Sequence, residues 1–241
     1  LIKFRKFLFV FLFFNLFLSI KTVGQNLNTI DSLIMIIQNS KDYSVRAQKS
    51  VELGKAYVQI DIVKAFDCFD KAIEIGKKND LINIVGDAYS NKGFACLLTG
   101  EKAKAISYLD TAMTFIRSSG NKVVLASIYQ NYGNYYHTTG NEAESMKYHL
   151  LSLKIREELG DTLGQARLFN GIAGIYLAQK NNEKALEWYG KSLAIVHNSK
   201  DKTVVSIILG NIGNIMLKMD KLEEAFSTYM ELLVLSKSTQ N

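Results

Sequence analysis

The sequence predicts an all-α solenoid of about five helical hairpins, and the main evidence is a repeat with a step of 40 residues. The repeat is marked by a small residue at each of four anchors: Gly93, Gly133, Ala173 and Gly213. Twelve residues after each anchor stands a second small residue: Ala105, Ser145, Ala185 and Ala225. A fixed period of this size is typical of stacked repeats. The 241 residues include no Pro, which favours long, uninterrupted helices.

The anchors have a packing explanation. Where the two helices of a hairpin cross closely, a side chain larger than a methyl group would push their backbones apart. Gly93 with Ala105, and Gly133 with Ser145, are suited to such a crossing. The tyrosines and leucines between these positions are expected to fill the space toward the next hairpin.

Turn signals place the hairpins along the chain. They are expected at residues 43–78, 80–118, 121–159, 161–199 and 201–238. Three breaks pair a glycine, suited to the left-handed end of one helix, with an Asn or Asp that can cap the next: Gly120-Asn121, Gly140-Asn141 and Gly160-Asp161. The first hairpin differs, because eleven residues rather than twelve separate Gly54 from Ala65. A shorter inner turn is expected there.

Residues 1–24 have the three-part pattern of a cleaved secretory signal peptide. A positively charged start precedes an apolar run over residues 7–20, and Thr22-Val23-Gly24 supplies small residues before a cut ahead of Gln25. An uncleaved N-terminal anchor is the alternative. Residues 25–42 are expected to form a lead helix that covers one end of the stack, and the repeat array follows over 43–241.

Charge and cysteine content narrow the function classes. The net charge of +6 falls to +2 without residues 1–24, which hold four bases and no acid. The remaining sequence shows no clustered basic face, so it lacks the signature of a nucleic-acid-binding protein. Cys68 and Cys96 occupy apolar positions in expected helices, which predicts two buried free thiols. A disulfide is the alternative in an exported protein.

The repeat pattern resembles the tetratricopeptide repeat. In the fourth repeat the matching residues are Ala173-Gly174-Ile175-Tyr176 and then Ala185 to Ser192. The usual period is about 34 residues; this chain uses 40 and lacks the closing Pro. With Asn131-Tyr132-Gly133-Asn134 in a first helix and Gly160-Asp161 between repeats, the chain is similar to the arrays of kinesin light chains and bacterial signalling proteins. The resemblance covers about residues 43–238 and implies a right-handed superhelix.

Catalytic patterns are absent from the sequence. His137, His149 and His197 occupy three different repeat positions, and none has a His or Cys partner at helical spacing. There is no His-Glu-x-x-His, phosphate-binding loop or nucleophile elbow. Because its sister repeats have Leu109, Tyr189 and Tyr229 at that position, His149 is expected to be a packing residue. We expect no enzyme activity, no metal and no cofactor.

The resemblance implies that the first helices line a concave groove. The candidate groove residues are mostly uncharged amides: Asn91, Gln130, Asn131, Asn134, His137, Arg167, Asn170, Asn211 and Asn214. Asn is a mediocre helix former, and its amide can pair with the main chain of an extended peptide. The alternative is that these amides brace neighbouring helices or contact water. Arrays similar to kinesin light chains use such an asparagine ladder, whereas a carboxylate clamp of the chaperone-binding kind is not expected, because Arg167 is the only base placed on this face.

The predicted function is a non-enzymatic array that binds a protein or peptide. By resemblance, it is the extracytoplasmic sensor part of a bacterial signal-transduction protein, exported to the periplasm or cell surface of a Gram-negative-type bacterium. A stand-alone periplasmic or surface scaffold for envelope protein assembly is the alternative. No nucleic acid is expected, and membrane contact only through the signal segment or a missing C-terminal part.

The last expected helix has an apolar face without a neighbour. That face comprises Leu222, Ala225, Phe226, Tyr229, Leu232 and Leu233. Either the chain is a fragment of a longer protein, or a partner or a second copy in a homo-oligomer covers this face.

Overall fold

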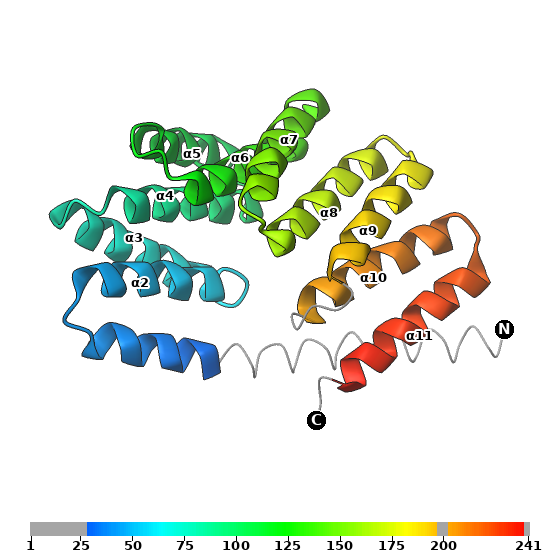
Figure 1. Ribbon diagram of the computed structural model, residues 1–241, viewed down its shortest axis with the longest axis horizontal. Helices are drawn as coiled ribbons and strands as arrows, with labels where there is room; N and C mark the ends of the chain where they lie inside the picture. Colours follow the sequence, from blue (N-terminus) through cyan, green and yellow to red (C-terminus); the bar gives the residue numbers. More distant parts are fainter. Residues whose placement is uncertain (1–27, 197–201, 239–241) are drawn as a thin grey trace.

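The computed structural model describes residues 28–196 and 202–238, and every regular element in these two ranges is an α-helix. A helix over residues 28–39 comes first. The helices that follow are α2 (Tyr43–Tyr57), α3 (Ile62–Lys78), α4 (Ile82–Leu98), α5 (Lys102–Arg117), α6 (Lys122–Thr138), α7 (Glu142–Glu158), α8 (Thr162–Ala178), α9 (Asn182–Val196), α10 (Lys202–Lys218) and α11 (Leu222–Ser238). They form antiparallel pairs that follow an arc from α2 to α11 (Figure 1). The predicted all-α stack is confirmed, while the predicted signal segment lies outside the described residues.

Left-handed residues end the helices, at intervals of 20 residues from Asp80 to Lys180 and again at Asp220. Positive φ angles occur at Asp80, Gly100, Gly120, Gly140, Gly160, Lys180 and Asp220. Around Gly140, the amide of Asn141 donates to the carbonyl of Tyr136 (2.8 Å) and the amide of Gly140 donates to His137 (3.1 Å). These two bonds define the Schellman motif, which satisfies the last carbonyls of a helix. The glycines expected at the turns therefore do what the sequence predicted, but Lys180 and Asp220 adopt the same conformation without being glycine.

Side-chain caps start most helices as expected. The carboxylates or amides of Asp42, Asp61, Asn121, Asn141 and Asp161 accept hydrogen bonds from main-chain amides of the first turn. Such caps satisfy amides that have no partner within the helix.

The anchor glycines lie where the two helices of a hairpin cross. A β-carbon on Gly93 would come within 2.9 Å of Leu109, and one on Gly213 within 2.8 Å of Tyr229. At Gly133 the approach is tight enough for Ser145 Oγ to donate to its carbonyl across 2.8 Å. The predicted reason for small residues at these positions is confirmed.

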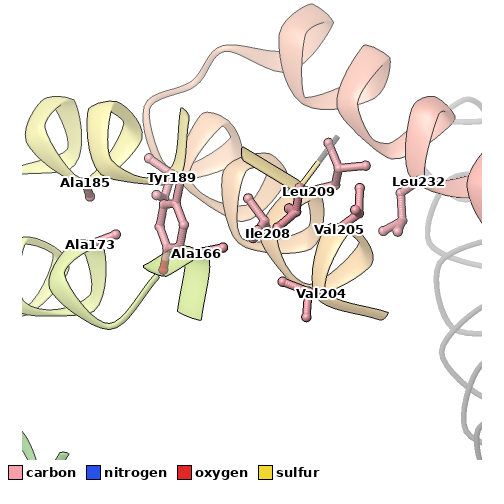
Figure 2. Close-up of a cluster of buried hydrophobic side chains, with 11 residues drawn as sticks. Ala166, Ala173, Ala185, Tyr189, Val204, Val205, Ile208, Leu209 and Leu232 are labelled. Carbon is pink, nitrogen blue, oxygen red and sulfur yellow. The ribbon is translucent and has the colours of Figure 1, made fainter. Parts of the chain in front are cut away.

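Buried side chains form a series of clusters between neighbouring helices rather than one central core. In the C-terminal cluster, Tyr189 of α9 packs together with Ala166 of α8 and Ile208 of α10 (Figure 2). Each hairpin therefore completes the core of the next, as expected in a solenoid.

Two further properties follow from the described helices. Cys68 and Cys96 are buried free thiols, as the sequence predicted, and burial raises the pKa of both. None of the helices in residues 28–196 and 202–238 combines the length and apolar character that spanning a membrane requires.

Candidate functional site

All nine candidate groove residues lie on α4, α6, α8 and α10, each of which is the first helix of its hairpin. Polar contacts also join these first helices directly. Asn131 of α6 bonds Ser90 of α4, and Asn211 of α10 bonds Asn170 of α8. Among the described residues, no hydrogen bond joins one second helix to another. In a curved stack, the helices that meet across repeats lie on the inner side, so this row forms the concave surface.

The Asn bonds form a ladder with a fixed separation. Asn131 Nδ2 donates to Ser90 Oγ (2.9 Å), and Asn211 Nδ2 donates to Asn170 Oδ1 (3.0 Å). Each bond joins residues 41 positions apart. These amides brace neighbouring hairpins, which is the alternative that the sequence left open.

Three more of the predicted amides are engaged by other groups. Asn91 Nδ2 bonds the carbonyl and the carboxylate of Asp87 within α4. Asn214 Oδ1 accepts a hydrogen bond from the Tyr229 hydroxyl (2.7 Å). Gln130 Oε1 accepts one from Arg156 Nη2 (3.0 Å). Their donor or acceptor capacity is thus partly used inside the protein.

Arg156 is a site residue that the sequence analysis missed. It lies on α7 with 12% of its side chain exposed, and it pairs with Asp161 in the turn to α8 while also bonding Gln130. Its guanidinium fills the space in front of Gly164, the third residue of α8. A buried arginine needs partners. The signal in the sequence was therefore the Asp161-x-x-Gly164 turn, which begins five residues after Arg156.

The ladder is interrupted between α6 and α8. At the position equivalent to Asn131 and Asn211, α8 has Gly171, and its expected partner Gln130 is held by Arg156. The imidazole of His149 lies against this glycine, 3.2 Å from where its β-carbon would be. His149 therefore takes the place of the amide contact at this one junction.

His149 is a buried, neutral side chain. It is 2% exposed, and its Nδ1 has no hydrogen-bond partner among the described residues. Burial, helped by the nearby His137 imidazole, lowers the pKa of His149 from 6.5 to about 4. The prediction that it is a packing residue agrees with this position.

Three candidate residues keep their side chains free of hydrogen bonds within the described part of the chain. Asn134 is half-buried on α6, and Arg167 is exposed on α8. His137 lies one turn after Asn134, with a buried Nδ1 that has no partner there and Nε2 3.9 Å from a β-carbon built on Gly174. These side chains lie on the concave surface of α6 and α8, where the Nδ1 atom of His137 is buried.

The described residues contain no group of three or more His, Cys, Asp or Glu side chains arranged to hold a metal ion. The two neighbouring histidines have no third ligand there. On α6 and α8 the concave surface carries the Asn134 amide, the His137 imidazole and the Arg167 guanidinium, which are hydrogen-bonding groups.

Comparison with known proteins identifies the repeats. Residues 125–159 match one tetratricopeptide repeat family and residues 164–237 match another. The chain is a tetratricopeptide repeat protein. A search of curated proteins finds no match to this array.

Solved structures share the fold of the array. A Rap protein complexed with Competence and Sporulation Factor aligns with a TM-score of 0.67, 15% identity and coverage of 90% of this chain and 71% of that one. The tetratricopeptide repeat-like repeats of a putative kinesin light chain from Podospora anserina align with a TM-score of 0.56 and 15% identity, over 84% and 100% of the two chains.

A third structure is a signal-transduction ATPase of the STAND class with a tetratricopeptide repeat sensor, from Pyrococcus horikoshii. It aligns with a TM-score of 0.64 and 19% identity over 88% of this array, which spans 32% of that protein. At these identities the similarity establishes the fold alone.

Proposed function

We propose that this tetratricopeptide repeat array binds an extended protein or peptide segment on its concave surface and performs no catalysis itself. The observation that carries the proposal is the difference between two sets of amides. Hydrogen bonds between hairpins engage the side chains of Asn131, Asn170 and Asn211. In contrast, the side chain of Asn134 makes no hydrogen bond with a described residue. The Asn134 amide is only half-buried and makes no bond within the described part of the chain, so it can hydrogen-bond a ligand in place of water.

The main chain of an extended peptide supplies what Asn134 lacks. Each peptide unit offers one donor and one acceptor, which match the two halves of a side-chain amide regardless of the peptide's own side chains. His137, one turn further along α6, can add a second contact of the same kind. The Rap structure, which holds Competence and Sporulation Factor, supports ligand binding by an array of similar fold.

A selection from a library of random decapeptides displayed on phage tests this proposal. The purified protein should enrich a set of peptides that compete with one another for one site. Replacing Asn134 by Ala should weaken their binding by about threefold to tenfold, the loss of one hydrogen bond of about 0.5–1.5 kcal/mol. Failure to enrich any peptide, or equal binding by the variant, would contradict the proposal.

We further propose that the array is the exported sensor part of a bacterial signalling protein, in the periplasm or at the cell surface. Support comes from the signal-like residues 1–24 and from the STAND protein, in which a similar array is described as a sensor. Immunoblotting of fractionated source cells tests this. A large, membrane-bound product with the array outside the inner membrane is expected; a small soluble periplasmic product would favour the scaffold alternative, and a cytoplasmic product would contradict export.

A further inference from the structure

The three C-terminal first helices contain no carboxylate. Helices α6, α8 and α10 together have neither Asp nor Glu, while they carry Lys122, Arg167, Lys202 and Lys218. The second helices between and after them are rich in acids: α7 has four Glu residues, α9 has two and α11 has three. Within the helices of this half of the array, acidic side chains therefore occur only on the outer row, and Asp161 and Asp220 lie in turns.

The N-terminal half of the concave surface differs. There Asp87 of α4 lies across from α2, and Lys55 Nζ pairs with its carboxylate at 2.9 Å. That pair neutralises both charges locally. Over α6 and α8, in contrast, the mid-helix base Arg167 is exposed and pairs with no acid among the described residues.

One face of α8 brings Arg167 and Gly174 into line. They are seven residues apart, which is two helical turns and about 10 Å along the axis. A peptide in an extended conformation covers that distance with about three residues. Asn170 lies between them on the same face, and His137 of α6 borders the Gly174 end.

Gly174 has a different environment from the anchor glycines. Its β-carbon would meet only His137 Nε2 at 3.9 Å, whereas the β-carbon of Gly133 would collide with His149 at 2.7 Å. Neither φ nor helix packing requires glycine at 174, although glycine lowers helix propensity. A bare stretch of backbone is suited to the close approach of another main chain.

We propose that the ligand of this array is an acidic peptide segment. Its extended main chain lies along α8 over Gly174, and one of its carboxylates meets the Arg167 guanidinium. This inference rests on the proposed function and adds the chemical class of the partner. A surface that carries bases and no carboxylates attracts an acidic segment and places no like charge beside it. A basic segment would find no carboxylate on this surface to pair with when it leaves water.

The decapeptide selection described above also tests this inference. The enriched peptides should contain more Asp and Glu than the starting library. For the three strongest binders, fluorescein-labelled peptides and their versions with Asn for Asp and Gln for Glu are compared by fluorescence anisotropy. The amide versions should bind roughly two- to fivefold more weakly, the range expected for an exposed ion pair.

Paired protein variants assign the effect to one residue. Arg167→Gln should weaken the binding of the acidic peptides by the same factor and leave the binding of the amide versions unchanged. Lys154→Gln removes an exposed base from α7, on the outer row, and should change neither. Addition of salt should weaken binding to the parent more than to Arg167→Gln.

The outcomes separate the two proposals. The acidic-segment inference would be overturned if the selected peptides depend on Asn134 but are not enriched in acids. It would also be overturned if they bind Arg167→Gln as tightly as the parent. Either result would leave the proposal of peptide binding intact. No enriched peptide at all would remove peptide binding and the acidic segment together.

Discussion

The imidazole of His149 occupies the space that a β-carbon on Gly133 would need. Its Cε1 and Nδ1 atoms lie 2.7 Å from that position, and Leu109 stands in the same relationship to Gly93 one repeat earlier. The ring also touches Gly171 of the next hairpin, 3.2 Å from where its β-carbon would be. His149 thus joins α7 to both neighbouring first helices at the junction where the asparagine ladder is interrupted.

Gly133→Ala should destabilise the array by about 1–3 kcal/mol, because the methyl group overlaps a ring that is buried on both sides. Urea unfolding monitored by circular dichroism measures the change. Gly210→Ala is the matched control: it adds the same methyl group to a first helix where nothing lies within 4 Å. The control should stabilise the protein by roughly 0.5–1 kcal/mol through helix propensity, and equal effects of the two variants would contradict the packing account.

The array should lose stability as the pH falls from 6.5 toward 4. The pKa of His149 is about 4 in the folded protein, against the ordinary value of 6.5 for an exposed histidine. Between these two pH values the unfolded chain therefore binds more protons than the folded chain. The contribution of neutral His149 to the free energy of unfolding is complete above pH 6.5. It declines as the pH falls below that value, by at most about 3 kcal/mol.

His149→Leu tests the origin of that acid sensitivity. Leucine is the residue that the chain itself uses at the equivalent position, 109, and it does not titrate. Urea unfolding at pH 7.5, 6, 5 and 4.5 should show a flatter stability profile for the variant than for the parent. Parallel profiles would mean that other groups cause the acid loss.

A reciprocal exchange at two turns tests the left-handed helix ends. Lys180 has φ of 58°, and Gly140 occupies the equivalent turn with φ of 80°. Lys180→Gly should stabilise the array by roughly 0.5–1 kcal/mol, and Gly140→Lys should destabilise it by about 1 kcal/mol, because a β-carbon is strained in this region. Thermal melting of both variants measures the shifts; changes of the same sign would contradict the assignment.

The two asparagines of α6 should separate binding from stability. Asn131 links α6 to α4, so Asn131→Ala should lower the unfolding free energy by about 1 kcal/mol. Asn134 makes no such link among the described residues, so Asn134→Ala should leave stability unchanged and weaken peptide binding. Urea unfolding and anisotropy on the same two samples check both halves, and a reversed pattern would show that the roles are exchanged.

Much of the fold was predictable because glycines and alanines carry the repeat. Gly93, Gly133 and Gly213 mark hairpin crossings that only small residues permit, and turn glycines mark the helix ends. The left-handed conformations of Lys180 and Asp220 were not predictable from residue type, since the position in the repeat imposes them against local preference.

The candidate site was only partly predictable. The sequence placed the amides on the first helices, but it did not reveal which ones bond within the protein. Those bonds depend on Arg156 and on residues 41 positions away, and such distances are set by the stacking of hairpins rather than by local pattern. Asn134, His137 and Arg167 stand out only after these internal bonds are known.

Photo-cross-linking in cells tests the central claim, that partners bind on the concave surface, most directly. p-Benzoylphenylalanine replaces Ala178, which is exposed one turn beyond Gly174 on α8, or Lys154 on the outer helix α7. We predict a discrete cross-linked product from position 178 that is lost with Asn134→Ala, and none from 154. Products from 154 alone, or products at 178 that do not depend on Asn134, would contradict the account.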